Sequence, residues 1–240
     1  MDFTGRLVLA VTNGAISGLV YAIWAYRNDR WPFAEDGMHA AAPESVPCRI
    51  PLPEHGPWDR VAYWDPVPTA RAMTGDPGTG PWEERSPLTV PGPFYAGATL
   101  DGVNGPYQLP RHVLSADHTQ EFVCRQPRTP REVDDLADVA ANEPLGSYAW
   151  DGDEHWTPES VRAWWADRGT VRAWIRDELA DRQGSCNDEE DLRAFEAYLD
   201  DGLEDYLRGY VFWLTEEREP LPGEELPELS DPRLPGIGQG

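Results

Sequence analysis

The stretch RHVLSADHTQEFVCRQPRTPREVDDLADVAANEP, residues 111–144, decides the fold of this chain. Its first half contains two short apolar runs, 111–115 and 121–125, separated by the more polar segment 116–120. Short apolar runs on either side of a polar connection are typical of a β-hairpin. The sequence therefore predicts a pair of antiparallel strands here.

A helix follows the hairpin in the same stretch. Thr129 is a favourable N-cap residue, Pro130 suits the first helical position, and Glu132 completes a capping box. Apolar residues then recur on one helical face: Val133, Leu136, Ala137 and Ala140. This spacing predicts a helix over residues 130–141 that ends before Pro144.

Further elements are predicted on both sides of this stretch. Short strands are expected at residues 61–64 and 146–150. The longest helix is expected over residues 188–217, where leucines and aromatic residues recur at helical spacing after Asn187.

Another helical segment is expected over residues 158–182, after the N-cap residue Thr157. In it, VRAWW (161–165) is followed ten residues later by VRAWI (171–175). On a helix, a shift of ten residues leaves equivalent side chains about 80° apart. Either a broad aromatic face is buried, or the helix breaks at Gly169, and the break is the favoured interpretation.

The whole pattern predicts an α+β fold with a small antiparallel sheet, three or more helices and a Trp-rich core. Eleven Trp and 40% hydrophobic residues in 240 positions are enough to build such a core. We expect a single domain over residues 1–219, with Pro-rich loops at 32–58 and 74–110. Residues 220–240 are expected to form a flexible, acidic, Pro-rich tail.

The chain is strongly acidic and contains no Lys. It has 43 Asp and Glu residues against 20 Arg, which gives a formal net charge of −23 at pH 7. A surface of this sign repels the phosphates of nucleic acids and of anionic lipids, which argues against direct nucleic-acid binding. A basic protein partner is compatible with it.

The acidic residues are concentrated near the C-terminus, because residues 187–231 contain 16 acids and three Arg. Carboxylates held on a rigid helix would suit an inhibitor of a basic protein, such as an immunity protein that neutralises a toxin or nuclease. A merely solvated helix face is the alternative. The residues predicted to contact the partner are Asp188, Glu189, Asp191, Glu196, Asp200, Asp201, Glu204 and Asp205.

A second hypothesis is an enzyme built on the turn at residues 151–155. Asp151, Asp153 and His155 stand between a predicted strand and a predicted helix, where active sites are common. Two carboxylates beside a His can bind a divalent metal or transfer protons, as in a metal-assisted hydrolase or an acid–base enzyme. A structural Asp-Gly turn is the alternative. No recognised metal or cofactor motif is present in the sequence, so we expect neither.

A third hypothesis is an accessory protein tethered to a membrane by residues 7–26, an uncharged segment of 20 residues. Small and polar residues interrupt this segment near its middle, so a buried core element is the favoured interpretation. The three cysteines, Cys48, Cys124 and Cys186, are too far apart in sequence for a metal cluster or a dense disulfide framework. A cytoplasmic location is the simplest expectation.

Two segments, EFVCRQPRTPREVDDL (121–136) and SYAWDGDEHWTPESVRAWW (147–165), resemble a family of acidic actinobacterial proteins without an established activity. The resemblance runs over residues 109–175. It implies a lineage-restricted accessory protein and brings no catalytic motif or site residue with it. By analogy, accessory proteins of this kind often serve as immunity proteins.

Overall fold

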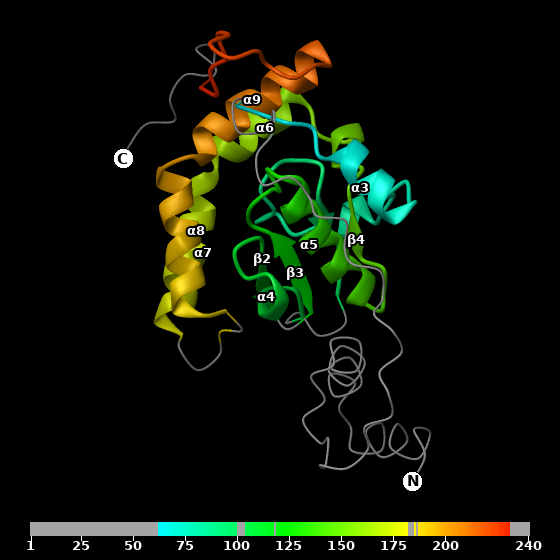
Figure 1. The fold of residues 1–240 in the computed structure, drawn as a ribbon. Coiled ribbons are helices and arrows are strands. Elements are labelled where there is room, and N and C mark those ends of the chain that lie inside the picture. Colours follow the sequence, from blue (N-terminus) through cyan, green and yellow to red (C-terminus); the bar gives the residue numbers. More distant parts are fainter. Residues whose placement is uncertain (1–61, 100–103, 118, 182–184, 186, 231–240) are drawn as a thin grey trace, which may run out of the picture. The chain divides into compact units, whose positions relative to one another are not determined.

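The computed structural model of the chain describes residues 62–99, 104–117, 119–181, 185 and 187–230 (Figure 1). They all belong to one compact unit, residues 53–240. The α-helices are α3 (Val67–Thr74), α4 (Asn104–Gln108), α5 (Pro130–Asn142), α6 (Pro158–Ala166), α7 (Arg168–Ala180), α8 (Glu189–Asp200) and α9 (Leu203–Glu216). The strands are β1 (Tyr95–Ala96), β2 (Val113–Asp117), β3 (Gln120–Val123) and β4 (Tyr148–Ala149), and two short 3-10 helices are η2 (Trp82–Glu84) and η3 (Gly152–Glu154).

The predicted hairpin is confirmed. Strands β2 and β3 are antiparallel, with Leu114 opposite Phe122. Strands β1 and β4 form a second antiparallel pair, and a single bridge between Ala98 and Gln120 lies beside the two pairs. The fold is therefore α+β with a small antiparallel set of strands, as the sequence predicts.

The hairpin lies between two hydrophobic cores because successive side chains of a strand point to opposite faces. Leu114 and Phe122 join the core that is formed with α6, α7, α8 and α9. Val113 and Val123 face the other way, into the core formed with α3 and α5. In Figure 1 the hairpin accordingly lies between α7 and α8 on one side and α3 on the other.

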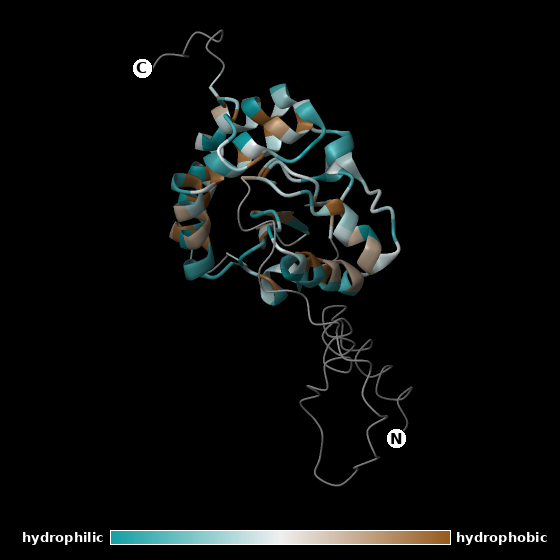
Figure 2. Cartoon of the chain, turned by 45° about the horizontal axis from the view of Figure 1, so that its top comes forward, coloured by the Kyte–Doolittle hydropathy of each residue, from teal (hydrophilic) through white to brown (hydrophobic). Residues whose placement is uncertain are grey.

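The helices are amphipathic and pack in pairs. Helix α6 packs against α9 and α7 against α8, and each pair runs side by side in Figure 1. Hydrophobic and hydrophilic residues alternate along these ribbons in Figure 2. In α8, the buried residues Leu192, Phe195 and Leu199 repeat at the spacing of one helical face. The exposed residues of this helix, which include Glu189, Glu190 and Asp200, lie outside that buried face.

The Trp residues that the structure describes contribute to both cores, although most of these lie at the edges. Trp150 and Trp156 are buried. Six others are partly buried against the two cores: Trp64, Trp82, Trp164, Trp165, Trp174 and Trp213.

Two long helices in the sequence prediction are each divided in the structure. The helical segment 158–182 consists of α6 and α7, which meet at Asp167, two residues before the expected break at Gly169. The expected helix over 188–217 consists of α8 and α9. Gly202 separates them with a left-handed φ of 99°, a conformation that residues with a Cβ rarely adopt.

Other corrections concern segments that were expected to be irregular or extended. The described part of the expected strand 61–64 is not a strand, but its Tyr63 is buried against the aromatic rings of α9. The expected loop 74–110 contains η2, β1 and α4. The expected flexible tail is packed before residue 231, because Leu229 is buried in the core and Arg208 donates hydrogen bonds to backbone oxygens of this segment.

Several predictions fall on residues outside the described ranges: the membrane-anchor hypothesis at 7–26, the loop at 32–58, and Cys48 and Cys186. Among the helices that the structure describes, none is both long and apolar enough to cross a membrane.

Candidate functional site

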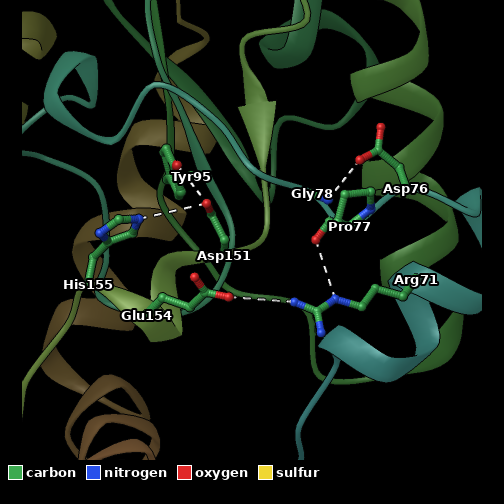
Figure 3. Close-up of polar contacts among 8 residues, drawn as sticks. All are labelled: Arg71, Asp76, Pro77, Gly78, Tyr95, Asp151, Glu154 and His155. Carbon is green, nitrogen blue, oxygen red and sulfur yellow. Dashed lines mark hydrogen bonds and ion pairs between the residues drawn. The ribbon is translucent and has the colours of Figure 1, made fainter.

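The acidic turn at 151–155 is η3 together with its two flanking residues. It follows the short strand β4, and Figure 3 shows the side chains around it. Asp151 is only 4% exposed, and its Oδ1 accepts a 2.7 Å hydrogen bond from the hydroxyl of Tyr95 on β1. His155 Nε2 lies 3.7 Å from the other oxygen of Asp151. Asp151 therefore connects η3 to β1.

Asp153 makes its contacts with a different part of the molecule. Its Oδ1 accepts a 2.7 Å hydrogen bond from the hydroxyl of Tyr210 on α9. Burial is the main cause that raises the pKa of Asp153 to about 7; the hydrogen bond from Tyr210 acts to lower this pKa, and the nearby charge of Asp65 acts to raise it. Asp153 therefore connects η3 to α9 and is about half protonated at neutral pH.

The remaining polar residues of the turn point to further partners. Glu154 forms a long, exposed ion pair with Arg71 of α3 at 3.9 Å, and Arg71 Nε donates a hydrogen bond to the backbone oxygen of Pro77 (Figure 3). The imidazole of His155 stacks on the indole of Trp82, with ring centroids 4.6 Å apart. Arg85 lies over the same indole, 3.7 Å from its centroid. Trp82 therefore contacts both His155 and Arg85.

These contacts do not bring the enzyme candidates into one constellation. Asp151 is bonded to Tyr95 and Asp153 to Tyr210, so the two carboxylates are bound to different elements. Within the residues that the structure describes, no group of three His, Cys, Asp or Glu side chains is placed to hold a metal ion. What the turn does in this arrangement is to fix η3 between β1 and α9.

The acidic residues predicted to contact a partner lie at the surface of α8, α9 and the connection between them. Six of them are exposed: Asp188, Glu189, Asp200, Asp201, Glu204 and Asp205. Asp191 and Glu196 are half-buried. The break at Gly202 places Asp201 outside both helices and puts Glu204 and Asp205 in the first turn of α9.

Arginines neutralise part of this surface. Arg193 forms a 2.8 Å ion pair with Glu189 one turn before it, and Arg172 of α7 forms a 2.7 Å ion pair with Asp200. Other acids of the set have no such partner in the described residues. Six acids of the set have no Arg or His nitrogen of the described residues within 4.0 Å: Asp188, Asp191, Glu196, Asp201, Glu204 and Asp205.

The eight acids do not share one helix face. Glu189 and Glu196 are seven residues apart and lie on the same side of α8, because seven residues make almost two turns. Asp191 is two residues from Glu189 and therefore about 200° away around the helix. Asp201, Glu204 and Asp205 lie close together in sequence, at the connection of α8 to α9 and in the first turn of α9.

A pocket that the sequence did not indicate lies on the Asp191 side of α8. Its other walls come from residues that flank the hairpin, including Arg111 before β2 and Arg125 after β3. These residues are 66 to 80 positions away from Asp191 in the chain, so no local pattern could have joined them. Only the tertiary packing of α8 against the hairpin brings them together.

Comparison of the chain with protein-family models, with curated proteins and with solved structures gave no match.

Proposed function

We propose that this protein is a non-catalytic binding protein that neutralises a basic protein, such as a toxin or nuclease, through the connection of α8 to α9. The observation that carries the proposal is the set Asp201, Glu204 and Asp205, all of which are exposed and lack an Arg or His partner in the described residues. We name these three residues the junction acids. A cytoplasmic location belongs to the same proposal.

The junction acids are held on a rigid base. Leu199 lies before Asp201, Leu203 lies between Asp201 and Glu204, and Leu207 lies after Asp205. All three leucines are buried in the core. A carboxylate that is fixed before binding loses less conformational entropy when it pairs with a basic side chain. Three like charges held in this way attract and orient a partner of opposite sign.

The pairing of other acids supports this choice of surface. Glu189 and Asp200 already have Arg partners, so a basic partner would have to compete with Arg193 and Arg172 for them. The junction acids require no such exchange.

The test is binding of the purified full chain to the basic protein encoded by a neighbouring coding sequence, measured by titration calorimetry at several salt concentrations. The triple variant Asp201→Asn, Glu204→Gln, Asp205→Asn is compared with Glu83→Gln, Glu159→Gln, Asp177→Asn, which removes three exposed carboxylates elsewhere. Both variants change the net charge equally, so the comparison separates a local array from general acidity.

We expect the junction variant to bind at least about tenfold more weakly and with a smaller dependence on salt, while the scattered variant changes affinity less than about threefold. Equal weakening by the two variants would mean that only net charge matters. Unchanged affinity in the junction variant, or no binding of the wild-type protein, would refute the proposed surface.

A further inference from the structure

A pocket of about 130 Å³ lies between α8 and the residues that flank the hairpin. One wall carries two arginines, Arg111 and Arg125, and the other carries Glu190 and Asp191 from the first turn of α8. Phe195 and Tyr198 of the same helix supply most of its aromatic surface. The pocket therefore offers both signs of charge on opposite sides of a partly apolar space.

The two arginines of the cationic wall are not held in direct ion pairs by the described residues. Within the described residues, no carboxylate oxygen lies within 4.0 Å of Arg111 or Arg125. The guanidinium of Arg125 instead lies over the ring of Tyr198, 5.1 Å from its centroid. Such a site has charge available for an anionic ligand.

Two residues that line the pocket, one on each side, also have a buried donor without an acceptor. Neither Arg125 Nε nor the Tyr198 hydroxyl has a hydrogen-bond partner, although both atoms are buried. A buried polar group without a partner destabilises a fold and calls for an explanation, which a missing ligand can supply. A planar carboxylate suits the forked geometry of a guanidinium and would provide the acceptors.

The acidic wall limits what that anion can be. Burial raises the pKa of Asp191, the neighbouring charges of Asp188 and Glu190 also raise it, and the charge of Arg111 on the facing wall acts in the opposite direction. A second negative charge on a ligand would be repelled by the same carboxylates, which disfavours a phosphate dianion. A positive group next to the ligand's carboxylate would be attracted by them. The two walls together fit a zwitterion.

The size of the pocket narrows the ligand further. A water molecule occupies roughly 10–15 Å³ in this measure of volume, so the pocket holds a ligand of about ten non-hydrogen atoms at most. Phe195 and Ala194 give the space between the charged walls an apolar lining. A small apolar side chain would be accommodated there.

We propose that this pocket binds a free α-amino acid, with the ligand's carboxylate at Arg111 and Arg125 and its ammonium at Glu190 and Asp191. The site is separate from the junction acids, and it does not depend on the proposed partner. The ligand would contact both α8 and the ends of the hairpin, so binding should also stabilise the folded chain.

The test is titration calorimetry of the full chain with a panel of small amino acids at neutral pH. The control ligands are propionate, which lacks the amine of alanine, ethylamine, which lacks its carboxylate, and inorganic phosphate. We expect at least one amino acid to bind with a dissociation constant of about 1 mM or tighter, and the three control ligands to bind at least about tenfold more weakly. Tighter binding of phosphate or ethylamine, or no amino acid binding at about 10 mM, would overturn the proposal.

Variants locate the binding site. Arg125→Gln and Asp191→Asn should each weaken amino acid binding at least about tenfold. Arg193→Gln is the matched control, because Arg193 is exposed on α8 and lies about 200° around the helix from Asp191. Thermal unfolding establishes that each variant folds. If Arg125→Gln does not fold, the binding measurement with Asp191→Asn is the test. Wild-type affinity in Asp191→Asn would contradict the assignment.

Discussion

The hydroxyl of Tyr210 on α9 donates a 2.7 Å hydrogen bond to Oδ1 of Asp153 on η3, 57 residues earlier in the chain. The carboxyl group is largely removed from water, and burial is the main reason that its pKa rises to about 7. The hydrogen bond from Tyr210 acts in the opposite direction but is outweighed. The folded protein therefore binds a proton at Asp153 more tightly than the unfolded chain does.

Replacing Asp153 with Asn should stabilise the protein at alkaline pH. Because the folded pKa is raised, the contribution of the protonated carboxyl is fully present below the unfolded pKa of about 3.9 and is lost as the pH rises to about 7. Asp153→Asn keeps an acceptor for Tyr210 and removes the charge. We expect the variant to be more stable by on the order of 2–4 kcal/mol at pH 8 and by much less at pH 4.5. Urea unfolding at both pH values measures the difference.

The control for this experiment is Asp177→Asn, which removes an exposed carboxylate from α7. It should change the unfolding free energy little at either pH value, because the side chain that it replaces is exposed. If Asp153→Asn and Asp177→Asn change the unfolding free energy at pH 8 by the same amount, the pKa of Asp153 is not raised by burial.

Gln126 is predicted to be essential for stability because its amide satisfies three backbone groups. Its side chain is 1% exposed, accepts a hydrogen bond from Phe94 N, and donates to the backbone oxygens of Val90 and Phe94. Gln126→Met keeps the length of the side chain and leaves these buried groups without partners. We expect the free energy of unfolding in urea to fall by on the order of 2–4 kcal/mol. The control Gln120→Met should lower it by less than about 1 kcal/mol, because the hydrogen bond of the Gln120 side-chain amide is exposed. A loss of similar size in the two variants would contradict this role.

The parts of the fold that the sequence predicted are those with local signals. Thr129 accepts a hydrogen bond from the backbone of Glu132 as an N-cap should, and α5 begins at Pro130 as expected. The hairpin followed from two short apolar runs on either side of a polar connection, and their paired residues are at most 10 positions apart in the chain. The break at Gly202 was missed because the apolar spacing continues across it, so periodicity alone does not reveal a change of helix direction.

The candidate site was less predictable because it depends on contacts between distant residues. The sequence placed Asp151 and Asp153 in one turn, but their separate partners, Tyr95 and Tyr210, lie 56 and 57 residues away. The acidic helix was evident from composition, whereas the Arg172 partner of Asp200 comes from another helix. Local patterns identify which residues are available, and tertiary packing decides which of them are neutralised.

Two helical glycines should respond in opposite directions to replacement by Ala. Gly209 of α9 is buried, and a Cβ added there would lie 2.8 Å from the Cβ of Tyr63 and 3.0 Å from backbone atoms. Gly169 of α7 is exposed, and a Cβ there would meet nothing within 4 Å. An Ala favours a helix over Gly by up to about 1 kcal/mol, because the unfolded chain then has fewer conformations to lose.

Gly169→Ala should therefore raise the unfolding free energy by up to about 1 kcal/mol, less if its place near the start of α7 reduces the gain. Gly209→Ala should lower it by about 1–3 kcal/mol, since Tyr63 is held among the rings of Tyr206, Tyr210 and Trp213 and cannot move away without disturbing them. Urea unfolding of both variants under identical conditions measures the two changes. Stabilisation by Gly209→Ala would show that the segment containing Tyr63 does not pack against α9. Tyr63 would then not belong to the aromatic cluster that it forms with Tyr206, Tyr210 and Trp213.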